Sequence, residues 1–321
     1  MSGNTAPSPT TPARLTLGSR GSPLALRQTH EVRDRLAAAW PELAGAIAVQ
    51  EIRTTGDAVR DRPLAEIGGK GLFIKEIEQA LMAGQIDAAV HSMKDMETTI
   101  APASVLVAVL PREDPRDAWL SPIADRVDDL PSGAKIGTAS VRRAAQVLNR
   151  RPDLQVVLFR GNVDTRLRKL AEGEVAGTFL AAAGLSRLGM LDKATRILEV
   201  DEMLPAVSQG AIGVQCRDGE ASARDAEIRN WLSILDDRPS RLRVTAERAM
   251  LATLDGSCRT PIAGHATLGG ARLTLSGMVF SLDGQSSHGA VDTSATDDPE
   301  ALGRTVGEAI LARGGRNFLA V

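Results

Sequence analysis

Hydrophobic and polar residues follow two alternating patterns through the first two thirds of the chain. Short apolar runs predict strands, and apolar residues that recur every three or four positions predict the helices between them. The predicted strands lie at 14–18, 46–52, 86–90, 105–110, 135–137, 155–159 and 177–181, and the predicted helices at 23–40, 72–82, 141–149, 163–171 and 184–188. Strand–helix alternation of this kind is typical of α/β proteins with mainly parallel sheets.

The pattern changes toward the C-terminus. A strand is predicted at 211–216, and the pattern leaves its sheet open, a return to the first domain being one possibility. Ser240 is predicted to cap a helix that runs to about Leu254. Strands at 264–268, 272–280 and 286–291 and a last helix at 299–312 then predict a small α+β domain with an antiparallel sheet.

Composition and charge narrow the classes of function. The chain has 321 residues, a net charge of −2, 2% aromatic residues and no tyrosine, which argues against a nucleic-acid-binding protein. No apolar run reaches membrane-spanning length, and the Ser/Thr/Pro-rich stretch 1–13 predicts a disordered tail without the apolar core of a secretory signal. The two cysteines, Cys216 and Cys258, are interpreted as reduced thiols of a cytoplasmic protein.

Arginine dominates the basic residues, supplying 32 of the 38. Several arginines fall in four short polar turns at 18–23, 138–143, 160–166 and 183–187, each predicted to join a strand to a helix. Such turns present backbone N–H groups and a helix N-terminus, and arginine adds a planar two-pronged donor for carboxylate or phosphate. Four of these turns at the carboxyl ends of strands predict a ligand that carries many negative groups.

Two residues are candidates for chemistry. Asp95 follows Lys94 at the end of a predicted buried strand, where the plainer alternative is a surface ion pair or a helix cap. A partly buried carboxylate beside cations can manage protons and stabilise a developing positive charge. Cys258 lies beside Arg259 after a predicted helix end, as either an idle thiol or an accessible thiolate. No histidine is evidently paired with it, which favours covalent attachment over hydrolytic catalysis.

A glycine-rich run, Gly-Gly-Lys-Gly at 68–71, lies in the long polar segment 57–71. It lacks the spacing of an ordinary phosphate-binding loop. The segment could be a mobile lid whose Lys70 meets an anion, or a solvated loop without a role.

Other classes of protein explain less of the sequence. A two-lobed anion-binding protein without catalysis accounts for the arginine turns, but not for Cys258 or for Asp95 beside Lys94. A metal enzyme is the weakest alternative because no His/Cys/Asp cluster has ligand spacing, so no metal is predicted.

Taken together, the motifs resemble the hydroxymethylbilane synthases, also called porphobilinogen deaminases, from about Arg14 to the C-terminus. Any one motif could arise by chance, but this many in order is very specific. The blocks that carry the resemblance are RGSPLAL at 20–26, GGKGLF at 68–73, HSMKD at 91–95, REDPRDA at 112–118, RGNV at 160–163 with Thr165-Arg166, QGA at 209–211, RVTAER at 243–248 and the loop with Cys258.

The resemblance implies three domains and a reaction. Residues 14–112 with 206–232, and residues 113–205, would form two lobes like those of periplasmic binding proteins, and residues 238–321 a third domain with the cofactor cysteine. The implied reaction deaminates four porphobilinogen molecules and condenses them onto a covalent dipyrromethane primer, followed by hydrolytic release of the linear tetrapyrrole hydroxymethylbilane. We expect a cytoplasmic monomer of porphyrin and heme biosynthesis, with porphobilinogen as substrate and no nucleic-acid or membrane partner.

The resemblance also implies roles for individual residues. Asp95 would be the catalytic carboxylate, and Cys258 would hold the dipyrromethane through a thioether. The cofactor would further contact Lys94, Thr138, Ser140, Arg142, Arg143 and Arg160, and the substrate Arg20, Ser22, Arg166, Arg187, Lys70 and Phe73. The chain departs from the family pattern at Met96-Glu97, where Val-Pro is more usual, and in two turn residues, Ala139 and Asp164.

Overall fold

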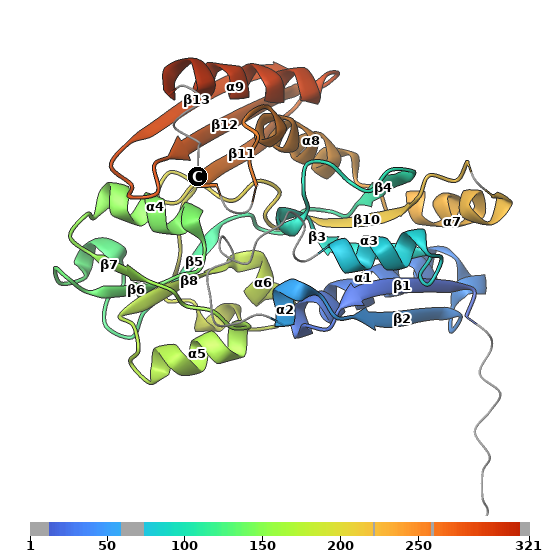
Figure 1. The fold of residues 1–321 in the computed structure, drawn as a ribbon, viewed down its shortest axis with the longest axis horizontal. Helices are drawn as coiled ribbons and strands as arrows, with labels where there is room; N and C mark the ends of the chain where they lie inside the picture. Colours follow the sequence, from blue (N-terminus) through green and yellow to red (C-terminus); the bar gives the residue numbers. More distant parts are fainter. Residues whose placement is uncertain (1–12, 59–73, 221, 258–259, 315–321) are drawn as a thin grey trace, which may run out of the picture.

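The computed structural model describes residues 13–58, 74–220, 222–257 and 260–314 (Figure 1). A first five-stranded sheet has the order β2-β1-β3-β10-β4. Its strands are β1 (Leu15–Arg20), β2 (Ile47–Ile52), β3 (Ala88–Ser92), β4 (Ser104–Val109) and β10 (Ile212–Arg217). β1 is parallel to β2 and β3, whereas β10 is antiparallel to both β3 and β4, so four of these strands run one way. The strand predicted at 211–216 therefore does return to the first sheet.

A second sheet repeats this arrangement with the order β7-β6-β8-β5-β9. Its strands are β5 (Asp117–Leu120), β6 (Lys135–Gly137), β7 (Gln155–Val157), β8 (Gly177–Ala181) and β9 (Arg196–Ile197). β5 runs antiparallel to β8 and β9, while β6 is parallel to β7 and β8. In each sheet the antiparallel strand, β10 in the first and β5 in the second, is the strand that the chain forms on crossing from the other sheet. We call the two sheets with their helices the first and second lobes. The mainly parallel α/β architecture is confirmed.

Short polar turns begin the helices of both lobes. The helices are α1 (Pro23–Ala39), α2 (Thr55–Ala58), α3 (Lys75–Met82), α4 (Val141–Arg150), α5 (Val163–Ala171), α6 (Ala182–Arg187) and α7 (Ala223–Ser233), with 3₁₀ turns at Pro41–Leu43, Met93–Asp95, Val127–Asp129 and Leu191–Lys193. Side chains of Ser22, Ser140 and Asn162 accept the N–H groups of residues three positions on, which caps α1, α4 and α5. Three of the four arginine segments join a strand to a helix, as predicted, whereas the fourth, 183–187, lies within α6, directly after β8.

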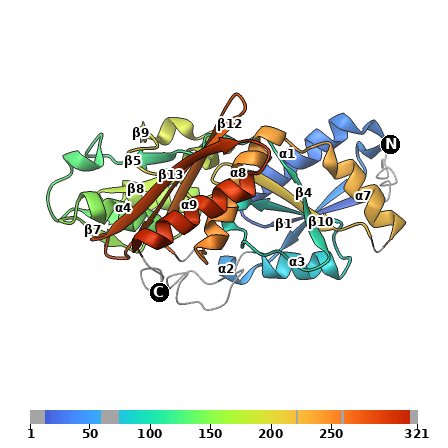
Figure 2. The same cartoon turned by 90° about the horizontal axis from the view of Figure 1, so that it is seen from above.

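A third unit follows, with β11 (Ile262–Gly269), β12 (Arg272–Phe280) and β13 (Ser287–Ala295) paired in an antiparallel meander. Helices α8 (Arg238–Thr253) and α9 (Pro299–Gly314) pack together on this sheet (Figures 1 and 2). Gly303 allows the close approach, because a Cβ atom there would lie 2.3 Å from the carbonyl oxygen of Ala246. The α+β arrangement agrees with the prediction, whereas the division into domains by residue number stays a prediction.

The predicted cap of α8 is wrong. Asp237 caps the helix by accepting the N–H of Ser240, and Arg238 and Pro239 form its first turn. Proline fits this position because an N–H in the first turn has no intrahelical partner. The Ser240 hydroxyl instead accepts the backbone N–H of Arg112, at 2.8 Å. Four elements were not predicted: α2, β5, α7 and β9.

A buried ion pair joins the third unit to the two lobes. Arg112, just after β4, places its guanidinium on both carboxylate oxygens of Glu247 in α8, at 2.6 and 3.1 Å. The two side chains are 1% and 0% exposed. Glu247 also accepts the backbone N–H groups of Ser208 and Ala266, and Arg112 donates to the carbonyl of Gln209. The pair therefore fixes α8 and β11 against the segment that connects the lobes.

Removing one partner of this pair should destabilise the protein strongly. Glu247→Ala is expected to cost about 3–5 kcal/mol of unfolding free energy, because the Arg112 guanidinium stays buried without a counter-charge. Chemical denaturation measures the loss. Glu300→Ala is the control, since it breaks the exposed Arg304–Glu300 pair of α9 and should change stability by less than about 1 kcal/mol. Equal effects of the two substitutions would contradict the structural role of the buried pair.

Candidate active site

Asp95 lies opposite Arg20 at the carboxyl ends of neighbouring strands. Asp95 closes the 3₁₀ turn that follows β3, and Arg20 is the last residue of β1. Their side chains form an ion pair, with Nη1 of Arg20 3.1 Å from Oδ2 of Asp95. The side chains keep 21% and 28% of their surface exposed, so the pair remains accessible to a ligand. The structure thus brings together a predicted catalytic residue and a predicted substrate-binding residue.

Lys94 connects this pair electrostatically to the second lobe. Burial lowers the pKa of Lys94 to about 8, against the opposing charge of Asp95. The charges of Arg143, Asp117 and Arg142, all from the second lobe, also act on it. Lys94 therefore interacts electrostatically with Arg142 and Arg143 of the second lobe, and burial disfavours its ammonium form.

The second lobe is organised around Asp117, which the sequence analysis did not single out. Asp117 begins β5, is fully buried, and accepts ion pairs from Arg142 and Arg143 at 2.8 and 2.7 Å. Burial by itself would raise the pKa of Asp117, but the two arginine charges outweigh burial and hold that pKa well below its usual range. Gln209, in the connection between the lobes, donates a further hydrogen bond to Asp117 at 2.9 Å.

The cations around Asp117 outnumber the carboxylates. Two guanidinium groups share the single carboxylate of Asp117, and the Nε atoms of Arg142 and Arg143 are buried without a hydrogen-bond partner in the described part of the chain. The pKa of Arg166 is lowered to about 10 by burial and by the positive charges of Arg143 and Arg160. A cluster that retains positive charge and unused buried donors suits a ligand with several carboxylates.

Three other predicted residues shape the turns. The hydroxyl of Ser22 caps α1, and that of Ser140 caps α4 through the N–H of Arg143. The hydroxyl of Thr138 accepts the N–H of Ser140 at 3.1 Å. These contacts fix the backbone from which the arginine side chains project, and any contact with a ligand stays a prediction.

Arg187 lies apart from the cluster around Asp117. It extends from α6 to the first lobe, where its Nε is 3.4 Å from a carboxylate oxygen of Glu31 in α1. Its Nη2 donates to the carbonyl of Gly210 at 3.0 Å. The structure therefore gives Arg187 a contact between the lobes that the sequence did not predict.

The predicted residues Lys70, Phe73 and Cys258 lie outside the described residues. The flanks of the cysteine loop are described: the N–H of Ser257 donates to the hydroxyl of Thr260 at 2.8 Å, just beyond the end of α8.

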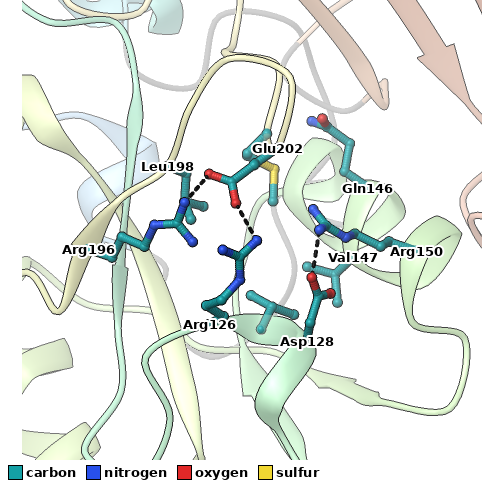
Figure 3. Close-up of a pocket in the computed structure, with 10 residues that line it drawn as sticks. Arg126, Asp128, Gln146, Val147, Arg150, Arg196, Leu198 and Glu202 are labelled. Atoms are coloured by element: carbon teal, nitrogen blue, oxygen red, sulfur yellow. Dashed lines mark hydrogen bonds and ion pairs between the residues drawn. The ribbon is translucent and has the colours of Figure 1, made fainter.

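A cavity in the second lobe is lined by none of the predicted site residues (Figure 3). It has a volume of about 30 Å³ between the Val127–Asp129 turn, α4 and β9. Its charged lining is already paired: Glu202 bridges Arg126 and Arg196, and Asp128 pairs with Arg150. Such a space holds little more than a water molecule, so it is not a candidate active site.

The described residues offer neither a metal-binding cluster nor a helix that could span a membrane. They contain no cluster of three or more His, Cys, Asp or Glu side chains that could hold a metal ion. Within the same part of the chain, no helix is long and apolar enough to cross a membrane.

The fold and the site define a two-lobed α/β protein that has a carboxylate–arginine pair in one lobe and surplus arginine charge in the other, an arrangement that suits an anionic ligand. Similarity to known proteins identifies the family. A family model described as porphobilinogen deaminase, dipyromethane cofactor binding domain, matches residues 15–225, and one for the C-terminal domain matches residues 241–312. The chain belongs to the porphobilinogen deaminase family.

Curated relatives extend over nearly the whole chain. Porphobilinogen deaminase of Nitrobacter winogradskyi is 52% identical over 95% of both chains, and that of Paracoccus denitrificans 53% identical over 97% of both. The chloroplastic porphobilinogen deaminase of Oryza sativa is 49% identical over 95% of this chain and 85% of the relative. Among solved structures, the methionine-binding protein MetQ is 11% identical, with a TM-score of 0.44 over 69% of this chain and 89% of its own.

The counter-charge of Arg142 and Arg143 can be tested directly. Asp117→Asn should cost about 3–5 kcal/mol of unfolding free energy, since it leaves two buried guanidinium groups without a carboxylate. Sulfate should restore part of this loss by binding the arginines, and thermal unfolding with and without sulfate measures both effects. Asp128→Asn, which breaks the half-exposed pair with Arg150, is the matched control. A variant at Asp117 that is as stable as this control would refute the charge argument.

Proposed function

We propose that this chain joins four porphobilinogen molecules in sequence, with Asp95 as the catalytic carboxylate and Cys258 as the point of covalent attachment. The observation that best supports this function is the Asp95–Arg20 ion pair. Lys94 lies next to Asp95 in the sequence, and the charges of the second-lobe arginines act on it. Each porphobilinogen brings two carboxylates, so a growing chain gathers negative charge. Surplus arginine charge from the second lobe supports such a ligand. As a member of its family, the protein is a transferase that uses a dipyrromethane cofactor.

The residues present fit that cofactor. The unused buried donors of Arg142 and Arg143, and the repulsion that Arg143 and Arg160 exert on Arg166, favour added carboxylates. In the proposal, the cofactor is held by Cys258, Lys94, Thr138, Ser140, Arg142, Arg143 and Arg160, and the substrate by Arg20, Ser22, Arg166, Arg187, Lys70 and Phe73. When bound, the dipyrromethane supplies the pyrrole to which the first substrate is joined.

Asp95 acts on the incoming substrate. Loss of ammonia from the aminomethyl group leaves positive charge on the substrate, and a fixed carboxylate in a partly buried site stabilises that charge as it develops. Arg20, 3.1 Å from Asp95, orients the carboxylate, and its positive charge attracts a substrate carboxylate. Charge stabilisation and substrate orientation are therefore assigned to neighbouring strand ends.

The proposed enzyme has three domains and acts alone in the cytoplasm. The chain divides into lobes at 14–112 with 206–232 and at 113–205, and a third domain at 238–321 that carries Cys258. It works as a monomer in the cytoplasm, with no nucleic-acid or membrane partner. The net charge of −2 and the scarcity of aromatic residues support the absence of a nucleic-acid partner.

Asp95→Asn should lower ammonia release from porphobilinogen by at least about 100-fold, because the neutral amide cannot oppose the developing charge. The unfolding midpoint should stay near that of the parent protein. Asp34→Asn, at an exposed pair on α1, controls for the loss of a carboxylate elsewhere and should retain full turnover. Turnover by the Asp95 variant close to that of its control would remove Asp95 from the mechanism.

The two cysteines can be distinguished by the mass of the purified, denatured protein. Cys258→Ala should lack the two-ring pyrrole adduct, and Cys216→Ala should keep it. Burial raises the pKa of the Cys216 thiol to about 11, so this residue offers almost no thiolate at neutral pH. An adduct that persists in Cys258→Ala and disappears in Cys216→Ala would reverse the assignment.

A further inference from the structure

An arginine of the third unit holds the backbone just after Asp95. Arg248, in α8, points its guanidinium at three consecutive carbonyl groups. Its Nη1 lies 3.5 Å from the oxygen of Met96, and its Nη2 donates to the oxygens of Glu97 and, at 3.3 Å, Thr98. Arg248 is partly buried, and burial lowers its pKa. The three carbonyls therefore replace much of the water that a guanidinium normally binds.

The same backbone segment has a second anchor. The Met96 side chain is 5% exposed and packs in a core cluster with Met93 and with Val244 of α8. The N–H of Met96 donates to the carbonyl of Met93, which closes the 3₁₀ turn that contains Asp95. On the other side of the turn, Met93 donates its N–H to Ala211. The backbone is thus fixed before and after Asp95, and α8 supplies contacts on the later side.

Helix α8 also leads toward the proposed attachment residue. Glu247, next to Arg248, forms the buried pair with Arg112, and the helix ends at Thr253, five residues before Cys258. Along the sequence, α8 therefore connects the residue that holds the Asp95 segment with the loop that contains Cys258.

We propose that Arg248 is a positioning residue, which sets the place of the Asp95 carboxylate by holding the backbone that follows it. This inference rests on the proposed function. Charge alone does not explain the residue, because a guanidinium that spans three carbonyls constrains the peptide planes that follow Asp95. A displacement of about 1 Å at a reacting group can cost about 100-fold in rate. Loss of the hydrogen bonds from Arg248 to these carbonyls should therefore affect the chemical step more than ligand binding.

Arg241 provides a matched control on the same helix. Its Nη2 also donates to backbone carbonyls of the first lobe, those of Leu106 and Val107, and its guanidinium pairs with Asp236. These contacts hold α8 against β4 and do not reach the Asp95 turn. Arg241→Met should therefore show how the loss of comparable hydrogen bonds from α8 to the first lobe affects stability when the Asp95 turn is left intact.

The experiment compares Arg248→Met, Arg248→Lys and Arg241→Met as purified enzymes, with covalent loading checked by denatured mass. We expect Arg248→Met to lower kcat for ammonia release by about 10–100-fold, with KM changed less than about threefold. Arg248→Lys should recover part of the rate, since an ammonium can still reach a carbonyl. Arg241→Met should keep kcat within about twofold. In a double variant that carries both Arg248→Met and Asp95→Glu, the total fold-loss in kcat should be smaller than the product of the two single losses.

Several results would overturn the inference. Arg248→Met and Arg241→Met could have equal kcat, the loss could appear in KM alone, or it could multiply fully with that of Asp95→Glu. Failure of both Arg248 variants to carry the covalent adduct, while Arg241→Met carries it, would assign the residue to cofactor loading instead. An unmodified enzyme that releases no ammonia from porphobilinogen would refute the proposed function itself, a result visible without any variant.

Discussion

Charge compensation of buried arginines organises this protein. Arg112 is neutralised by Glu247 of the third unit, and Arg142 and Arg143 share Asp117 of the second lobe. Gln209 links the two groups, because its backbone carbonyl accepts from Arg112 and its side-chain amide donates to Asp117. A single residue between the lobes therefore joins the ion pair that fixes the third unit to the ion pairs that organise the site. Unpaired burial of these charges would cost several kcal/mol, so the three parts of the molecule depend on one another.

Incomplete compensation within the same network creates the binding capacity. Asp117 satisfies only one charge of the two arginines beside it, and the charges of Arg143 and Arg160 add to burial in lowering the pKa of Arg166. In the proposed function, a ligand with several carboxylates completes the cluster. The protein reaches this local positive charge with a net charge of −2, which explains why global composition did not indicate an anionic ligand. Asp95 is paired with Arg20, and both residues belong to the first lobe.

Local patterns predicted what depends on local sequence. The alternating strands and helices, the Ser22 cap and the position of the arginine turns are encoded within a few residues, and the structure has them. β5 was missed because it has only four residues and begins with a charged Asp117 whose partners lie 25 or more positions away. The roles of Asp117 and Arg248 arise from long-range contacts, and Ser240 was misassigned because its hydroxyl serves Arg112 rather than its own helix. Their positions in the sequence made Asp95 and Cys258 candidates, whereas their proposed roles come from the family resemblance.

The central claim is that the arginine cluster serves a chain that grows while covalently attached to the protein. The most direct test is the denatured intact mass of the unmodified protein, followed over time with limiting porphobilinogen. We predict a starting mass that includes two pyrrole rings, then species heavier by one, two, three and four substrate-derived units, and a return to the starting mass as product leaves. A constant protein mass during ammonia release would show that no covalent chain grows, and would contradict the account.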